Sequence, residues 1–92
     1  MKTSLSTDHR EYFNQRHILV NRTPPAVLQR ARQVIERLEQ GVPYWRLRGK
    51  RLRCNRDLIS IPIGRKWRIL AKDCSGRIVP AEVLSHARYN DL

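Results

Sequence analysis

Hydrophobic and polar residues alternate along three consecutive stretches in the second half of the chain, at residues 58–63, 67–72 and 77–85. A repeat of two is typical of strands that bury one face of a sheet. The segments between them, residues 64–66 and the four-residue turn 73–76, each contain a glycine and suit hairpins. The pattern therefore predicts three antiparallel strands joined as a meander. The residues expected on its buried face are Ile59, Ile61, Ile63, Trp67, Ile69, Ala71, Val79, Ala81 and Val83.

An earlier segment repeats with the period of an α-helix. Its apolar residues recur three or four positions apart, while charged and amide side chains occupy the other face. Thr23 is expected to cap the N-terminus ahead of Pro24, and Gly41 to end the helix. Arg32 is spaced to form an ion pair with Glu36. The apolar stripe, which should cover one face of the sheet, comprises Val27, Leu28, Ala31, Val34, Ile35 and Leu38.

The N-terminal residues carry weaker signals. Residues 1–6 are small and polar and are expected to fray. Residues 6–17 suit a short helix anchored by Tyr12 and Phe13. The chain has 92 residues, enough for one domain with one core. Together these elements predict an α+β fold, with N-terminal helices packed on a small antiparallel sheet, in a single domain over residues 1–92.

The net charge of +11 and a pI near 11.1 set the chain apart from an ordinary soluble domain. Residues 44–72 hold ten cationic side chains and one acidic one, so this third contributes +9. Such an excess favours a polyanionic partner, with nucleic acid ahead of an acidic protein segment and an anionic membrane. Arginines predominate, and guanidinium groups bind phosphate in a forked geometry. The alternative is an arginine-rich surface that is merely solvated.

Within this basic third, residues 42–56 interleave cations with aromatic and apolar side chains. The pattern predicts an irregular or edge strand, whose charges would also protect its edge from aggregation. The residues expected inside are Trp45, Leu47, Leu52 and Cys54, and those expected outside are Arg46, Arg48, Arg51 and Arg53. Cationic side chains can bind phosphates, and neighbouring aromatic rings can stack on bases. The alternative is that Tyr44 and Trp45 both belong to the core. The candidate nucleic-acid contacts over the whole chain are Tyr44, Arg46, Arg48, Lys50, Arg51, Arg53, Lys66 and Arg88.

A candidate catalytic set lies near the last two strands and consists of Arg65, Arg68, His86 and Tyr89. Neighbouring strands of a meander would bring Arg68 close to His86 and Tyr89. An imidazole can exchange a proton, and a guanidinium can stabilise a phosphorane-like transition state. A phenol can stack or assist proton transfer. The set suffices to cleave RNA through its 2′-hydroxyl without a metal or other cofactor. The alternative is a surface histidine and a tyrosine that only packs.

Cys54 and Cys74 are the only cysteines, and neither stands at metal-binding spacing with a histidine. Two isolated thiols fit a reducing cytoplasm and are expected to stay unpaired. No apolar run approaches the length needed to cross a membrane, and no signal sequence follows Lys2. We therefore expect a cytoplasmic protein with no metal site and no membrane partner.

The order of these features resembles the RelE/ParE superfamily, the toxins of bacterial type II toxin–antitoxin modules. The resemblance implies a helical hairpin packed on a twisted antiparallel sheet, in agreement with the pattern above. It covers roughly residues 24–90. It rests on a helix, then Leu47-x-Gly49, a strand with Trp67-Arg68-Ile69-Leu70, a glycine turn, and a last strand ending in His86-x-Arg88-Tyr89.

The superfamily divides by target, and so do the functions that the resemblance implies. RelE-like members cleave mRNA in the ribosomal A site, which implies a metal-independent ribonuclease acting on ribosome-bound mRNA. Its catalytic residues would be Arg65, Arg68, His86 and Tyr89. ParE-like members inhibit DNA gyrase instead. A third alternative is a non-catalytic, basic nucleic-acid-binding module. A toxin of either kind implies an acidic antitoxin as its partner, with RNA, the ribosome or gyrase as its target.

Overall fold

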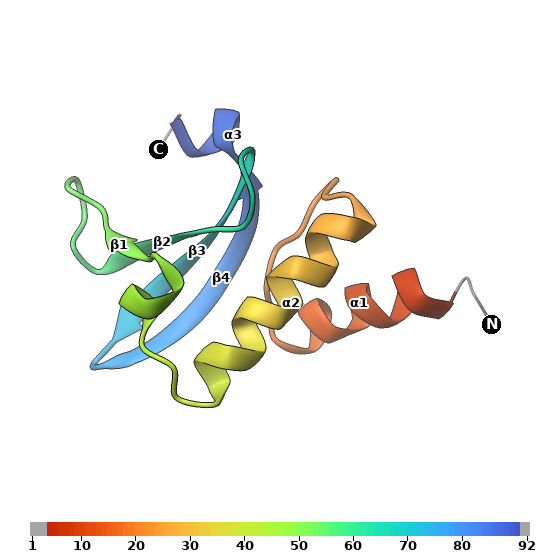
Figure 1. The fold of residues 1–92 in the computed structure, drawn as a ribbon, viewed down its shortest axis with the longest axis horizontal. Coiled ribbons are helices and arrows are strands. Elements are labelled where there is room, and N and C mark those ends of the chain that lie inside the picture. The colour runs from red at the N-terminus through yellow and green to blue at the C-terminus, as the bar shows by residue number, and fades with distance from the viewer. Residues whose placement is uncertain (1–3, 91–92) are drawn as a thin grey trace.

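Two helices, α1 (Ser4–Gln15) and α2 (Pro25–Glu39), lie on one face of a four-stranded antiparallel sheet in the computed structural model, which describes residues 4–90 (Figure 1). The strands are β1 (Lys50–Arg51), β2 (Leu58–Pro62), β3 (Trp67–Cys74) and β4 (Arg77–Ser85). A 3₁₀ helix, η1 (Tyr44–Leu47), precedes the sheet, and the short helix α3 (His86–Asn90) follows it. The strands lie side by side in chain order. The α+β class and the meander of the last three strands are therefore confirmed.

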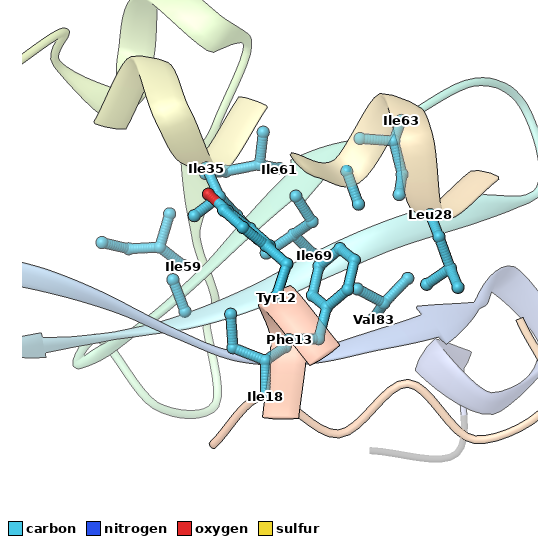
Figure 2. Packing of buried hydrophobic residues seen from close by; sticks show 12 residues of the cluster. Tyr12, Phe13, Ile18, Leu28, Ile35, Ile59, Ile61, Ile63, Ile69 and Val83 are labelled. Atoms are coloured by element: carbon cyan, nitrogen blue, oxygen red, sulfur yellow. The ribbon is translucent and has the colours of Figure 1, made fainter. Parts of the chain in front are cut away.

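The main core lies between the sheet and the two N-terminal helices (Figure 2). Tyr12 and Phe13 of α1 enter it as predicted, and Phe13 is fully buried. The α2 stripe enters it through Leu28, Ala31 and Ile35. Burial of apolar surface on this scale is the main favourable term in folding. From β2, β3, β4 and the loop after β2, the cluster takes Ile59, Ile61, Ile63, Ile69, Ala71 and Val83.

The first helix starts and ends earlier than the one predicted at residues 6–17. It begins at Ser4 and ends at Gln15, and His17 has already left helical geometry with a φ of 58°. The fraying expected over residues 1–6 falls partly outside the described residues, at 1–3, while residues 4–6 are helical.

The segment after α1 ties the N-terminal region to the free edge of the sheet. Leu19 forms an isolated parallel bridge with Glu82 of β4. Its N–H donates to the carbonyl of Ala81 at 3.0 Å, and its carbonyl accepts from the N–H of Val83 at 2.8 Å. This bridge covers part of an edge that would otherwise present unpaired backbone groups.

The second helix confirms the predicted stripe and the Arg32–Glu36 ion pair, whose atoms are 3.3 Å apart. Its N-terminal cap differs from the prediction. Pro24 occupies the cap position, and no side chain caps the helix. Thr23 is instead buried, and its hydroxyl donates to the carbonyl of Val20. The hydroxyl is therefore used to close the preceding turn.

A β-bulge in β4 overturns the predicted placement of two apolar residues. Leu70 pairs with Glu82 but Ala71 pairs with Pro80, so Ala81 is an extra residue on β4. An extra residue shifts the alternation of side chains between the two faces. Val79 and Ala81 are therefore exposed instead of buried. Their place against the main core is taken by Ile78.

The turn between β3 and β4 is tighter than the four-residue turn predicted at 73–76. Cys74 pairs with Arg77, which leaves only Ser75 and Gly76 in the loop. Both have positive φ values, 57° and 91°. This is the pattern of a type I′ hairpin turn, whose twist matches that of the flanking strands.

The opposite face of the sheet is also partly covered, although only one buried face was expected. Leu52, Leu70 and Leu84 form a second, smaller cluster there. Leu58 and Tyr89 pack against it. The period of two had placed Leu70 outside; it is buried because α3 folds back over this face.

Residues 42–56 begin with η1 instead of a strand, and only Lys50–Arg51 pair at the sheet edge. Leu47 and Leu52 face inward as predicted, but Trp45 and Cys54 are exposed. Arg51, expected outside, is half-buried. It pairs with Ile59, a core residue, and residues directly opposite each other share a face of the sheet. The predicted alternation fails because η1 and the left-handed Arg48 interrupt it.

Among the described helices, none is long and apolar enough to cross a lipid bilayer. Cys54 and Cys74 are exposed and free, as expected.

Candidate functional site

Three of the four predicted catalytic residues meet on the face of the sheet opposite α1 and α2. Arg68 on β3 pairs with Leu84 of β4, and α3 begins two residues after Leu84. The Arg68 guanidinium carbon lies 4.8 Å from the centre of the Tyr89 ring. The His86 ring stacks on Tyr89 with a centroid distance of 6.3 Å. We call Arg68, His86 and Tyr89 the α3 cluster.

The guanidinium of Arg68 is held in place by a residue that the sequence pattern did not single out. Its Nη1 donates to Ser60 Oγ at 3.0 Å. Ser60 lies on β2 and is only 2% exposed. A buried hydroxyl group needs a hydrogen-bond partner, and the partner of the Ser60 hydroxyl is the charged guanidinium of Arg68. In the sequence, Ser60 stands out as a polar residue between Ile59 and Ile61, but the alternation of residues does not indicate which side chain it contacts.

Two contacts fix α3 over this face. The backbone N–H of His86 donates to the carbonyl of Lys66 at 2.6 Å. Arg88 Nε forms an ion pair with Glu82 at 3.2 Å. The imidazole of His86 is exposed, and Tyr89 is half-buried against the leucine cluster. The exposed imidazole and the Arg68 guanidinium therefore both adjoin the Tyr89 ring.

The fourth predicted catalytic residue, Arg65, lies exposed in the loop between β2 and β3. No hydrogen bond or ion pair of its side chain is seen among the described residues. The same loop contains Lys66, whose carbonyl holds α3 while its side chain is exposed. The structure therefore does not bring Arg65 into the α3 cluster.

The predicted nucleic-acid contacts divide into a structural and an exposed group. Arg51 Nη2 forms a 2.7 Å ion pair with Asp73, and its Nε donates to Tyr44 Oη at 3.1 Å. These bonds raise the pKa of Arg51. The Arg51 hydrogen bond, followed by the backbone N–H of Gly76, lowers the pKa of the Asp73 carboxyl. The exposed group consists of Arg46, Arg48, Lys50, Arg53, Lys66 and Arg88, of which Arg88 is ion-paired.

A hollow of about 850 Å³ lies at the other end of the sheet. Its walls come from the C-terminal end of α2, the segment that leads into η1, and the β3–β4 hairpin. Figure 1 shows this hairpin turn at the end of the sheet away from α3. The apolar walls include Leu38, Val42, Ile78 and Val79, and Trp45 lies at the same hollow. The sequence pattern had not indicated it.

Among the residues that the structure describes, no three His, Cys, Asp or Glu side chains lie close enough together to hold a metal ion.

A family model described as the ParE-like toxin domain matches residues 25–91. The match starts at the first residue of α2 and therefore spans the four strands, the α3 cluster and most of the hollow, whereas α1 and two residues that line the hollow, Arg16 and Ile18, lie outside it. No curated protein and no solved structure gives a significant match.

Proposed function

The chain belongs to the family of ParE-like toxin domains, within the RelE/ParE superfamily of toxins from toxin–antitoxin modules, and we propose that it acts as a ribonuclease on ribosome-bound mRNA. The observation that supports this target is the α3 cluster, in which a cation, an imidazole and a phenol meet. Membership of the family implies an antitoxin partner. Because the toxin carries a net charge of +11, we expect an acidic antitoxin segment to neutralise it.

The proposed reaction is attack of the RNA 2′-oxygen on the adjacent phosphorus, with cleavage of the bond to the 5′-oxygen. Arg68 stabilises the extra negative charge in the transition state. A guanidinium has five N–H donors, and the bond to Ser60 leaves others for phosphate oxygens. One group removes the 2′-hydroxyl proton and another protonates the leaving 5′-oxygen; His86 serves as acid or base, and Tyr89 stacks on a nucleobase or assists proton transfer. The products are a 2′,3′-cyclic phosphate and a 5′-hydroxyl.

The exposed cations on and around η1 and β1 supply the affinity for the RNA backbone. Arg46, Arg48, Lys50 and Arg53 are all exposed, so their charges are available to phosphates. Such contacts position an RNA but carry no sequence information. Recognition of the ribosome would use the same electrostatic attraction.

The experiment that tests the proposal compares variants of the α3 cluster. Arg68→Ala should lower cleavage of a translated mRNA roughly a hundred- to a thousandfold, while affinity for RNA changes little, because Arg68 acts mainly in the transition state. His86→Gln should also lower the rate. Arg37→Ala is the matched control, since it removes one exposed arginine from α2 and should leave the rate unchanged. Cleavage of free RNA should proceed equally in EDTA.

Melting temperatures must accompany these rates, because Arg68 also contacts Ser60 and Tyr89. Folded Arg68 and His86 variants that remain as toxic as the parent chain would remove the α3 cluster as the active site.

Inhibition of DNA gyrase is the second candidate function, and the ParE-like family match favours it. It predicts that the toxin arrests replication and DNA supercoiling while mRNA stays intact. Parallel assays of translation and supercoiling after induction separate the two targets. Binding of RNA with neither effect would leave the basic nucleic-acid-binding module.

A further inference from the structure

Trp45 is the most exposed large hydrophobic residue of the described chain, with 66% of its surface open to solvent. It belongs to η1 and lies at the hollow beside the β3–β4 hairpin. An indole so far out of the core contributes little to folding, because the hydrophobic term scales with the area removed from water. Its aromatic surface is available to a partner.

Trp45 packs on a tyrosine that is itself held by other side chains. Its ring meets the Tyr44 ring edge-on at a centroid distance of 5.4 Å. Tyr44 is in turn held by Arg51, which is anchored to Asp73. At Gly49 an added Cβ would lie 2.8 Å from the Tyr44 carbonyl oxygen, so glycine permits this close packing. A preorganised aromatic ring loses little conformational freedom when it binds.

The charges around the hollow leave a positive balance. Glu39 is paired with Arg16, and Asp73 is paired with Arg51. Arg77 also lines the hollow, and its side chain is exposed with no ion pair seen among the described residues. Between residues 44 and 56 there are six cations and no acid. The surroundings of the indole therefore favour an anionic partner with a flat apolar group.

We propose that Trp45 and the adjoining hollow bind an unpaired base of single-stranded RNA, with its phosphates near Arg46 and Arg77. Bases stack on aromatic rings with little regard to sequence, while basic side chains follow the backbone. This inference extends the proposed function, on which it rests, by adding a binding site at the far end of the sheet. From Arg68 to Asp73 the strand spans about 17 Å, so the two sites contact different nucleotides.

The test uses 2′-O-methyl RNA, which cannot be cleaved by attack of a 2′-hydroxyl. Trp67→Phe leaves Trp45 as the only tryptophan, because the chain has two. Single-stranded 2′-O-methyl RNA should quench the emission of Trp45. An abasic strand of equal charge and a duplex of the same sequence should not. Fluorescence anisotropy on the parent chain provides a second measurement that does not depend on the folding of the Trp67→Phe variant.

In that second measurement, Trp45→Ala should weaken binding of the single strand roughly ten- to a hundredfold and leave binding of the abasic strand unchanged. Trp45→Phe should restore part of the loss. Equal affinities of the Trp45→Ala variant and the parent for the base-bearing strand overturn the proposal. The proposal is also overturned if the acidic antitoxin quenches the emission of Trp45 and single-stranded RNA does not, because the hollow would then be a protein-docking surface. If RNA stacks on Trp45 but is not cleaved, the result supports this binding site and counts against the proposed ribonuclease. The experiments therefore distinguish failure of the binding site from failure of the proposed function.

Discussion

Arginine side chains supply most of the positive charge of this toxin, but their surroundings give them different tasks. Arg51 joins β1 to the β3–β4 hairpin through Asp73 and to η1 through Tyr44. Arg68 is held between Ser60 and Tyr89, where it keeps a defined orientation. Arg46 and Arg48 are exposed. Sequence position alone does not separate these roles, because the partners of Arg51 and Arg68 lie on other elements of the fold.

The Arg51–Asp73 pair should make stability depend on pH below the neutral range. The pKa of Asp73 is lowered in the folded state from its ordinary value of 3.8. A lowered pKa means that the ion pair stabilises the fold fully above that value and loses its effect as the pH falls through the folded-state pKa. Urea midpoints of the parent should therefore exceed those of Asp73→Asn at pH 5 to 7, and the two should converge as the pH falls from 3.8 through the lower folded-state pKa.

Asn is a suitable replacement for Asp73 because its carbonyl can still accept the Gly76 N–H that the carboxylate accepts at 2.7 Å. A difference in urea midpoint that stays constant down to pH 2 would show that the charge of Asp73 adds nothing to stability.

At the scale of elements, the parts of the fold with a continuous pattern could be predicted from the sequence and the interrupted parts could not. Helix α2 and the strand meander could be predicted because their hydrophobic residues recur with the periods of a helix and of a strand. The bulge at Ala81 was missed because one extra residue leaves no mark in composition. In the candidate site, the meeting of Arg68 with Tyr89 followed from strand order, whereas Ser60 required the register between β2 and β3.

The turn from η1 into β1 depends on Gly49. A Cβ at this position would lie 2.8 Å from the Tyr44 carbonyl oxygen and 3.1 Å from Ile61 Cγ1. Gly49→Ala should therefore lower the free energy of unfolding by about 1–3 kcal/mol, as overpacking does. It should also change the emission of Trp45, since Tyr44 must move. Lys50→Ala, at an exposed neighbouring position, is the control and should change neither the melting temperature nor the emission.

For the molecule as a whole, the uneven distribution of charge sets how it meets a polyanion. Residues 44–72 carry ten cations and one acid, and the structure places most of these cations on η1, β1 and the adjoining loops. A localised field of this kind orients an approaching RNA and speeds association. The α2 helix, on the other side of the main core, also carries exposed arginines, which offer a matched comparison.

Binding of RNA should depend steeply on salt. If about six phosphates of a single strand are engaged, affinity should fall about three-hundredfold between 50 and 200 mM salt. Arg46→Gln combined with Arg48→Gln should reduce the slope of log affinity against log salt by about 1.4, at about 0.7 for each lost contact with a single strand. Arg30→Gln with Arg37→Gln removes the same net charge from α2 and should leave the slope nearly unchanged. Equal slopes for the two double variants would contradict a localised interface.

The bridge between Leu19 and β4 has a consequence for synthesis of the toxin. The chain emerges from the ribosome N-terminus first, so Leu19 is made long before Ala81 and Val83, its two backbone partners. The strands can add one after another as hairpins, because each neighbours the next in the chain. The N-terminal segment, in contrast, can dock on the sheet edge only after β4 exists. In a growing chain this edge contact therefore stays unformed until the final strand has been translated.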